Sequence, residues 1–479
     1  MDFAREKAKQ LANSAGDILS QRRMALTPRD LMPFSFSRTT KRRSKKKSAT
    51  KEQLRKILAK AETMAISRIK HGKAPMQILL DNSTVKKALG KMAPDSKEKG
   101  SKDWQPQLFW TSRSMPMRIS KSDLKKLPDE VENIKSIYPN RPLSIPNLVE
   151  TKAMEAENSD ILSATWGLEK IKAMAAWGAH GAYGEGVTIG LLDTGVDASH
   201  PDLKGKIAHW AEFTKSGRQV AGSTPFDSDR HGTHCAGTLV GGRESGRHIG
   251  VAPKAKIAAG LVLNGKYGGS DAQVLAGIDW AVERGVDVLS MSLGGLVIDS
   301  NTPPTYTDAI YSCLEAGIPV VAAIGNEGHQ TTGLPGNDPF AYSVGATDPG
   351  DKIAGFSGGR TQIIQQSDFF YPDQLPLTYS KPDLSAPGVG IRSSVPGGGW
   401  EIFSGTSMAT PLVAGAIALL LSATTIRGKL ENSEKAFEIQ NLLSSSVMEL
   451  GESGQDHRYG FGRLDVLRAI DFAHDLGYK

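Results

Sequence analysis

Cysteine and long apolar runs are scarce in this sequence of 479 residues. Its two cysteines, Cys235 and Cys313, exclude a disulfide-stapled fold and argue against a structural cysteine–zinc site. The longest apolar stretch, residues 412–421, is about half of the roughly 20 residues that a membrane-spanning helix needs. Residues 1–23 contain charged side chains and no continuous apolar block, so they do not have the pattern of a secretory signal. We therefore expect a cytoplasmic protein with no membrane contact, no metal and no other cofactor.

Positive charge is concentrated in the first third of the chain. Of its 58 basic and 51 acidic residues, 33 and 15 fall within residues 1–150, which gives this part a net charge of +18 and the remainder −11. The two parts should attract each other, or the first should bind an anionic partner. The like-charged run at residues 41–47 favours a solvated tail.

The pattern of apolar and polar residues divides the chain into four parts. Residues 1–75 form a basic extension, and residues 76–147 a small α+β unit. Residues 148–160, with mixed charges, are expected to be an exposed linker. From about residue 161 to residue 479, short apolar strands alternate with helical stretches, which favours a parallel sheet with helices on both faces.

The expected elements follow from this pattern. In the large domain, we expect strands at 187–192, 256–259, 286–291 and 319–324, and helices at 271–284, 307–316 and 410–421. In the small unit, we expect strands at 76–80, 108–110, 115–119 and 131–138, and helices at 81–92 and 121–127.

One acidic and one basic side chain lie where we expect the functional site of the large domain. Asp193 follows a buried strand, at the edge where open α/β sheets bind their ligands. His231 lies where a loop becomes a helix, in the motif His-Gly-Thr-His at 231–234. Alternatively, both histidines of this motif could be structural residues without a catalytic role. A metal site of His231, His234 and Cys235 is disfavoured, because adjacent residues on one helix diverge.

Two further segments supply polar groups. Asn326 follows the strand expected at 319–324 and would expose an amide donor at the edge of the sheet. Ser407 lies between small residues at the start of a helix, where the helix dipole favours developing negative charge. A single asparagine in a turn, or a single Gly-x-Ser, would not indicate a function. The four segments together supply the groups of one catalytic mechanism.

That chemistry is acyl transfer through a nucleophilic serine. Ser407 would attack the carbonyl, and His231 would take its proton and later return it to the leaving amine. Asp193 would hold the imidazole in the right tautomer and stabilise its cationic form. The amide of Asn326 and the backbone N–H of Ser407 would bind the oxyanion.

Residues 161–472 resemble the subtilisin-like serine peptidases, the subtilase family, in which the triad follows the same chain order of Asp, His and Ser. The matching segments are the block around Asp193, His-Gly-Thr-His at 231–234, Ser-Met-Ser-Leu-Gly-Gly at 290–295, Gly-Asn-Glu at 325–327 and Gly-Thr-Ser-Met-Ala at 405–409. The resemblance implies a three-layer α/β/α fold with a mostly parallel sheet. It also implies endopeptidase activity on protein or peptide substrates.

The resemblance also implies how a substrate binds. Ser292, Leu293 and Gly294 would pair with an extended substrate strand and line one wall of the primary pocket. Gly333 matches the floor of that pocket, which should therefore be roomy and accept a large apolar or aromatic side chain. The peptide bond between residues 334 and 335 matches one that is often cis in the family.

Residues 76–147 resemble, in element order and position, the inhibitory propeptide of these enzymes. This resemblance implies that a segment at 134–141 enters the cleft and that self-cleavage falls within residues 142–160. A permanently attached accessory domain is the alternative.

Three features depart from the family pattern. The loop at 241–247 has one carboxylate and two arginines where many relatives bind calcium, so we do not expect that site here. Residues 360–381 are longer than in compact members and form either a surface loop or a partner surface. Residues 1–75 have no counterpart, and they could be a solvated tail or a docking site for an acidic protein or nucleic acid.

The alternative to an active enzyme is a binding module, in which a catalytically silent fold of this family serves as a scaffold.

Overall fold

The structure of the chain is a computed structural model. It describes residues 107–117, 119–120, 123–125, 127, 137–145, 163–297, 305–365, 370 and 375–479. The predictions for the basic extension 1–75, for the elements at 76–92, for most of the strand at 131–138 and for the linker 148–160 lie outside these residues.

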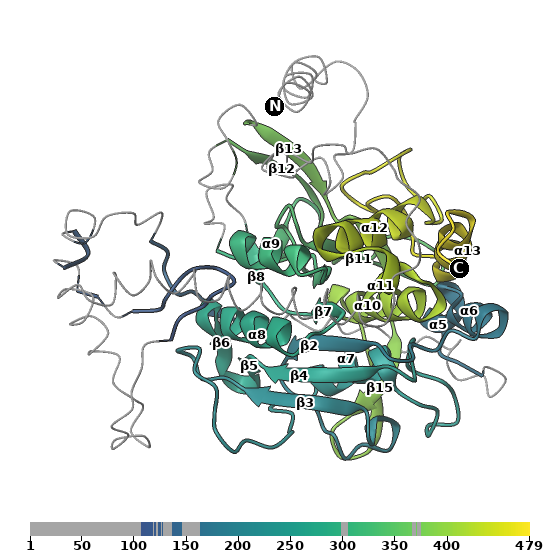
Figure 1. Cartoon of the computed structure of the whole chain (residues 1–479), viewed down its shortest axis with the longest axis horizontal. Helices are drawn as coiled ribbons and strands as arrows, with labels where there is room; N and C mark the ends of the chain where they lie inside the picture. The colour runs from purple at the N-terminus through teal and green to yellow at the C-terminus, as the bar shows by residue number, and fades with distance from the viewer. Residues whose placement is uncertain are drawn as a thin grey trace, which may run out of the picture.

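The core of the molecule is a seven-stranded sheet in which every neighbouring pair is parallel. The strand order is β14-β11-β9-β7-β2-β4-β3, and Figure 1 shows β2, β4 and β3 running side by side. The strands are β2 (Thr188–Asp193), β3 (Ile207–Glu212), β4 (Lys256–Leu261), β7 (Val288–Met291), β9 (Val320–Ala323), β11 (Tyr342–Thr347) and β14 (Leu384–Pro387).

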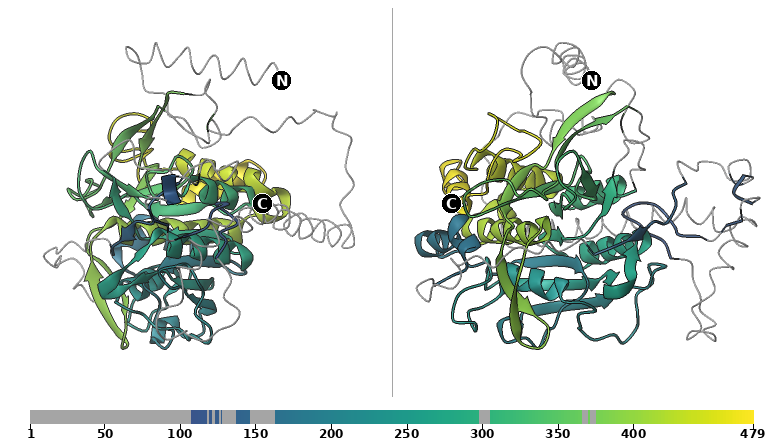
Figure 2. Two further views of the ribbon diagram at one scale, coloured as in Figure 1. Left: turned by 90° about the vertical axis from the view of Figure 1, so that its left-hand side faces the viewer. Right: turned by 180° about the vertical axis from the view of Figure 1, so that it is seen from behind.

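Helices cover both faces of this sheet. The buried side chains form two apolar clusters, and successive residues of β2 divide between them, Leu191 in one and Leu192 in the other, because side chains alternate across a strand. The cluster of Leu191 includes α5 (Trp166–Lys170), α6 (Ala173–His180), α7 (His231–Val240), α10 (Thr406–Ala423) and α13 (Val466–Asp475). The cluster of Leu192 includes α8 (Asp271–Glu283) and α9 (Thr307–Glu315). The expected three-layer α/β/α fold is confirmed, and Figure 2 shows it from two further sides.

Smaller elements surround the sheet. They are β1 (Pro142–Leu143), β5 (Leu263–Asn264), β6 (Gly268–Ser270), β8 (Gly295–Val297), β10 (Thr332–Leu334), β12 (Arg360–Ile364), β13 (Leu377–Lys381), β15 (Ile391–Val395), β16 (Gly399–Phe403), α11 (Ile426–Lys429), α12 (Asn432–Ser445) and two 3₁₀ turns, η2 (Pro201–Leu203) and η3 (Gly265–Tyr267). The longer segment 360–381 forms the antiparallel ribbon β12–β13. Phe370, which lies between these two strands in the sequence, is buried and stacks on Phe340 with ring centroids 5.9 Å apart.

The strands and helices expected in the large domain are present, and one helix is longer than expected. α10 begins at Thr406, four residues before the predicted start at residue 410. A proline inside a helix removes one hydrogen bond of the helix, because it has no N–H. The structure keeps Pro411 inside the helix, and the site described below explains how the missing N–H is tolerated.

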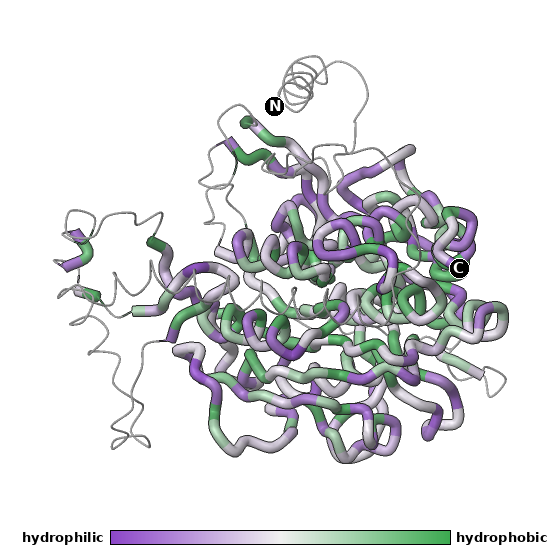
Figure 3. The backbone as a smooth tube through the Cα atoms, in the orientation of Figure 1, coloured by the Kyte–Doolittle hydropathy of each residue, from purple (hydrophilic) through white to green (hydrophobic). Residues whose placement is uncertain are grey.

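Figure 3 colours the backbone by hydropathy, and many of the outer loops are hydrophilic. α10 has the length and apolar composition of a membrane-spanning helix, but 89% of its 18-residue window is buried inside the protein. It is therefore the central helix of the core.

The described parts of the small unit differ from expectation at one point. Instead of two paired strands at 108–110 and 115–119, a single antiparallel bridge joins Phe109 and Ser114. The backbone N–H groups of Trp110 and Thr111 donate to the side chain of Asp279 on α8, so they are not available to a partner strand. The described residues 123–125 and 127 are helical, as predicted for 121–127.

Candidate active site

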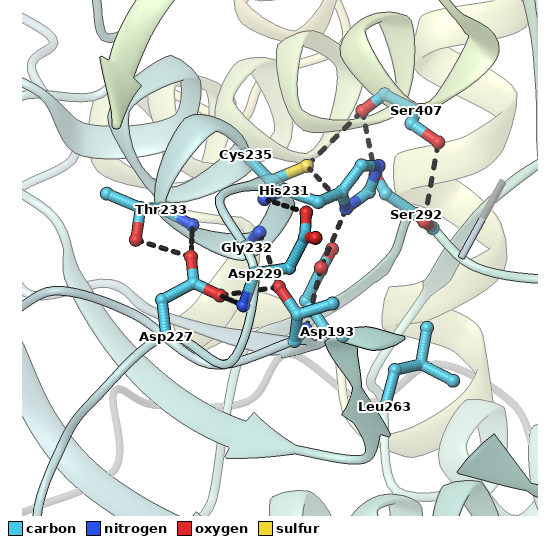
Figure 4. Close-up of polar contacts among 12 residues, drawn as sticks. Asp193, Asp227, Asp229, His231, Gly232, Thr233, Cys235, Leu263, Ser292 and Ser407 are labelled. Atoms are coloured by element: carbon cyan, nitrogen blue, oxygen red, sulfur yellow. Dashed lines mark hydrogen bonds and ion pairs between the residues drawn. The ribbon is translucent and has the colours of Figure 1, made fainter. Parts of the chain in front are cut away.

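Asp193 and His231 meet at the carboxyl edge of the sheet. Asp193 is the last residue of β2, and His231 is the first residue of α7. Their side chains are both buried, and Nδ1 of His231 lies 2.7 Å from Oδ1 of Asp193. Nε2 of His231 has no hydrogen-bond partner among the described residues. The pair in Figure 4 thus leaves one ring nitrogen uncommitted.

Hydrogen bonds from the neighbouring loops fix where α7 begins. The first amides of a helix have no acceptor within it. Here the N–H of His231 donates to Asp229 at 3.2 Å, that of Gly232 to the Thr194 hydroxyl at 2.9 Å, and that of Thr233 to Asp227 at 2.7 Å. Thr194 follows Asp193 directly, so these bonds tie the start of α7 to the end of β2 and place the histidine over the aspartate.

Two glycines allow this close approach. A Cβ atom added to Gly232 would lie 2.1 Å from the carbonyl oxygen of Gly195, and one added to Gly195 would lie 2.1 Å from that of Phe226. Gly195 also has a φ of 110°, a conformation that side chains with a Cβ rarely adopt. The backbone contact that brings β2 and α7 together therefore requires glycine at both positions.

The two histidines of the motif have opposite electrostatic surroundings. Burial lowers the pKa of His231, but the adjacent Asp193 carboxylate and Cys235 together outweigh it and hold that pKa well above its usual value. Burial lowers the pKa of His234 to about 3, so this ring is neutral at physiological pH. Its Nε2 lies 3.0 Å from the carbonyl of Ile391, and its ring stacks on Phe403 at 4.3 Å. The two rings therefore differ in charge preference: His234 favours the neutral form, whereas His231 favours the protonated form.

A cysteine completes the buried group around His231. Among the described residues, the donor atoms of Asp193, His231 and Cys235 form the one cluster that could hold a metal, all within 4.8 Å of one another. Burial raises the pKa of the Cys235 thiol, which weakens it as a ligand. His234 points elsewhere, so the set of His231, His234 and Cys235 does not converge. Cys235 and Cys313 are both free thiols.

Ser407 lies one residue into α10, and an unusual bond holds its backbone. A helix normally uses the N–H four residues later to occupy each carbonyl, but that residue is Pro411, which has no N–H. The Ser407 carbonyl accepts instead from the hydroxyl of Ser292 at 2.8 Å and the thiol of Cys235 at 3.5 Å. The Cys235 sulfur also lies 3.9 Å from Nδ1 of His231, so this thiol contacts both the Ser407 carbonyl and the imidazole.

The side chain of Ser407 does not bond to the imidazole in this structure. Its hydroxyl donates to the carbonyl of Ser292 at 3.4 Å, whereas Nε2 of His231 has no partner among the described residues. The structure thus brings the predicted nucleophile and base into one buried site with their catalytic hydrogen bond unformed.

The amide of Asn326 is fixed beside Ser407. Its Oδ1 accepts from the backbone N–H and the hydroxyl of Thr406, both at 2.8 Å. With the oxygen held in this way, Nδ2 lies next to Gly405, where an added Cβ would be 3.1 Å from it. The amide donor therefore faces the turn that leads into Ser407, as an oxyanion donor requires.

The predicted substrate-binding residues line one edge near Ser407. Ser292, Leu293 and Gly294 follow β7, and Gly294 forms an antiparallel bridge with Ser144. Gly333 in β10 pairs with Leu296 in β8, and its N–H donates to the carbonyl of Ile324, two residues before Asn326. The peptide bond between Leu334 and Pro335 is cis.

A segment of the chain itself occupies this edge. β1 (Pro142–Leu143) pairs antiparallel with β6 in the register Pro142↔Ser270 and Leu143↔Gly269. The next residue, Ser144, bridges Gly294 on the other side. The strand begins at residue 142, one position beyond the segment 134–141 that was expected to enter the cleft, although the carbonyl of Arg141 already accepts the N–H of Asp271 at 3.2 Å.

Sequence reasoning missed three residues that shape the site. Thr406 orients Asn326 from 80 positions away, and Asp271 holds Arg141 across 130 positions, so neither had a local signal. Pro411 did have one, because a proline four residues after a candidate nucleophile frees the carbonyl of that nucleophile for another donor.

Comparison with known proteins agrees with this geometry. Residues 184–462 match the profile of the Subtilase family. The chain is 34% identical to subtilisin E of Bacillus subtilis over 316 residues, which cover 64% of the chain and 71% of the relative. It is 37% identical to thermitase of Thermoactinomyces vulgaris over 316 residues, 65% of the chain and 97% of the relative. It is also 37% identical to an intracellular serine protease of Paenibacillus polymyxa over 261 residues, 53% of the chain and 72% of the relative. The chain belongs to the subtilase family and is a subtilisin-like serine endopeptidase.

Proposed function

We propose that Ser407, His231 and Asp193 are the catalytic triad of this endopeptidase and that Asn326 and the Ser407 N–H bind the oxyanion. The observation that carries this assignment is the 2.7 Å contact between Nδ1 of His231 and the buried carboxylate of Asp193. A ring whose Nδ1 proton is held by a carboxylate presents Nε2 as the base. Among the described residues, that Nε2 has no competing partner.

The proton moves between two groups of the site. Oγ of Ser407 gives its proton to Nε2 as it attacks the scissile carbonyl, and the imidazolium returns it to the leaving amine. Water then repeats the sequence and releases the acid. Because the hydroxyl now donates to Ser292, this mechanism requires the side chain to turn towards Nε2 when a substrate binds. Catalytic hydrogen bonds often tighten only in the substrate complex.

We propose further that residues 141–145 act as an inhibitor within the same chain. Ser144 and Leu143 lie between Gly294 and β6, where a substrate strand would add to the sheet. Leu143 is buried, and its carbonyl approaches Gly268 so closely that an added Cβ there would lie 2.1 Å away. A segment seated in this way excludes a substrate from the same path.

A second contact anchors the small unit to the catalytic domain. Phe109 is buried in the cluster that includes α8 and α9. Asp279 on α8 accepts the N–H of Trp110 at 2.8 Å and that of Thr111 at 3.1 Å, and the Thr111 hydroxyl also donates to it. The hydroxyl of Ser312 on α9 donates to the Thr111 carbonyl at 2.8 Å. These contacts support the interpretation of residues 76–147 as a docked inhibitory unit.

Hydrolysis of one fluorogenic peptide by matched serine variants tests the triad. The test uses the full chain carrying Leu143→Asp, which should open the cleft. Adding Ser407→Ala should lower kcat by about 10⁶, the loss that the corresponding change causes in subtilisin. Adding Ser199→Ala, which removes an exposed hydroxyl bonded to Asp197, should change kcat less than twofold. Activity of the Ser407→Ala chain within tenfold of its parent would refute the assignment.

The activity of the Leu143→Asp chain relative to wild type tests the inhibitory segment. A buried, unpaired carboxylate costs several kcal/mol, so the segment should leave the cleft and the rate should rise more than tenfold. Leu143→Met keeps the volume and should stay inhibited. The intact mass of wild type beside that of Ser407→Ala shows whether self-cleavage follows within residues 142–160. Equal rates for wild type and Leu143→Asp would refute inhibition by this segment.

We also propose a location for the protein and a partner for its basic extension. One relative is named an intracellular serine protease, and both cysteines are free thiols, so we propose the cytoplasm as the location, to be tested by cell fractionation. The basic residues 1–75 are proposed to dock an acidic protein or nucleic acid, and a binding titration at increasing salt tests this. Absence of binding at low salt would refute the second proposal.

A further inference from the structure

Arg141 is held by a charged site at the start of α8, outside the catalytic centre. Its Nε lies 2.9 Å from Oδ2 of Asp271, and its Nη2 lies 3.2 Å from Oδ1. The same guanidinium donates to the hydroxyl of Thr305 at 2.9 Å. The backbone of Arg141 is bound as well: its N–H donates to Oδ2 of Asp271 at 2.9 Å, and its carbonyl accepts the N–H of Asp271 at 3.2 Å. This fork of bonds is a geometry that arginine makes and lysine does not.

The receptor for this arginine is held by groups of the catalytic domain. The hydroxyl of Tyr306 donates to Oδ1 of Asp271 at 2.6 Å. Burial, reinforced by the Asp271 carboxylate, raises the pKa of Tyr306 well above its usual value, so the phenol keeps its proton and remains a donor. The Asp271 side chain is 3% exposed, against 22% for Arg141. Asp271 is also the first residue of α8, where the helix dipole favours a negative charge.

The strand register relates this receptor to the bond that is cleaved. Antiparallel pairing of Ser144 with Gly294 places the position two residues further along opposite Ser292. Ser292 is bonded to Ser407, so a substrate residue in that position carries the scissile carbonyl and is P1. Counting back, Ser144 occupies P3, Leu143 occupies P4 and Arg141 occupies P6.

We propose that Asp271 is a specificity-determining residue that selects arginine at P6 of a substrate. The proposal rests on the proposed function, because it takes residues 141–145 to follow the path of a substrate. Any peptide that adds to β6 in the same register brings its P6 side chain to the same carboxylate. The preferred substrates are therefore segments with arginine at this position.

Three peptides that differ only at P6 measure this preference. Each has the sequence Asn-X-Pro-Leu-Ser-Ile-Phe with a fluorogenic leaving group, where X is arginine, citrulline or alanine. Citrulline keeps the shape of arginine and removes its charge. The ratio of kcat/KM between two peptides on one enzyme is independent of how much of that enzyme is inhibited, so the full chain can be used. Wild type should prefer arginine over citrulline by about 10- to 100-fold, as expected for charge-assisted, forked hydrogen bonds.

Two variants distinguish selection of a substrate by Asp271 from binding of the inhibitory segment by the same residue. Asp271→Asn should reduce the arginine-to-citrulline ratio to below about threefold. Arg141→Ala should raise the rate on all three peptides, because the segment loses its anchor, yet keep the wild-type ratio. Thr305→Val, which removes one acceptor at the edge of the site, should lower the ratio partially and serves if Asp271→Asn does not fold.

The outcomes distinguish the two proposals. A ratio near one in wild type and in Arg141→Ala would overturn the role of Asp271, even if Arg141→Ala is more active. Unchanged rates in both Arg141→Ala and Leu143→Asp would instead refute inhibition by residues 141–145. An unchanged, high ratio in a folded Asp271→Asn would assign the preference to another group and overturn the proposal.

Discussion

Replacement of Thr406 by valine tests how the oxyanion donor is held in place. The hydroxyl of Thr406 donates to Oδ1 of Asn326 at 2.8 Å and accepts the N–H of Gly325 at 3.3 Å. Valine has nearly the same shape, so the substitution removes both bonds without a large change in volume. The backbone N–H of Thr406 still donates to the same Oδ1 at 2.8 Å. One of two restraints on the amide is therefore lost, and the donor itself remains.

The expected size of the effect follows from these contacts. A neutral hydrogen bond contributes about 0.5–1.5 kcal/mol, which corresponds to a factor of roughly 2 to 12 in rate. Removal of the whole donor by Asn326→Leu should cost about 10²- to 10³-fold in kcat, the range measured for the corresponding donor of subtilisin. Thr406→Val should thus lower kcat several-fold and leave KM nearly unchanged, because the oxyanion exists only in the transition state and the tetrahedral intermediate.

Steady-state kinetics on a double-mutant cycle isolate the contribution. The cycle uses the chain carrying Leu143→Asp as its parent, with Thr406→Val and Asn326→Leu singly and together. Thr410→Val is the matched control, because its hydroxyl is buried one turn further along α10 and donates only to the Thr406 carbonyl at 2.9 Å. If Thr406 acts through Asn326, its replacement should have no further effect once Asn326 is leucine. A Thr406→Val loss that is fully additive with Asn326→Leu, or equal to that of Thr410→Val, would refute the reasoning.

Three other substitutions test separate parts of the structure. Asp193 and Cys235 together outweigh burial and raise the pKa of His231 well above 6.5, so wild-type activity should fall as the pH drops through that raised pKa and the base becomes protonated. In Asp193→Asn the acidic limb should move to lower pH and kcat should fall about 10⁴-fold; an unmoved limb in the pH–rate profile would contradict this. Phe109→Ala should weaken docking by about 3–5 kcal/mol and raise hydrolysis by the full chain at least tenfold, whereas an unchanged rate would show that Phe109 does not anchor the inhibitory unit. Lys381→Met leaves the buried Asp383 carboxylate, which lies 2.7 Å from the lysine, without its cation. The free energy of unfolding in urea should therefore fall by about 3–5 kcal/mol. A fall below about 1 kcal/mol would disprove the importance of this pair.

The elements that carry the triad could be predicted because each has a strong local pattern. An apolar strand ends at Asp193, and a run of small residues starts a helix at His231, so strand end and helix start were visible in the sequence. The start of α10 was predicted four residues late, at residue 410, and Pro411 lies inside the helix. The bonds from Ser292 and Cys235 to the freed Ser407 carbonyl make an interior proline tolerable, and they come from segments 115 and 172 positions away.

The contacts that were not predicted join distant segments through single side chains. The pairing of Arg141 with Asp271 and that of Thr111 with Asp279 depend on how the small unit lies on α8. No local periodicity encodes such an arrangement, since the residues involved are ordinary charged and polar types. The strand pair expected at 108–110 and 115–119 was wrong for the same reason. The structure has a single bridge there, because the N–H of Trp110 donates to the side chain of Asp279.

Covalent labelling with a fluorophosphonate tests the central assignment most directly. The reagent reacts with a serine only where a base and an oxyanion site activate it. Peptide mapping of the labelled Leu143→Asp chain should find the added mass on Ser407, and His231→Ala should abolish the labelling. Labelling of a different serine, or none in a folded chain with an open cleft, would contradict the account.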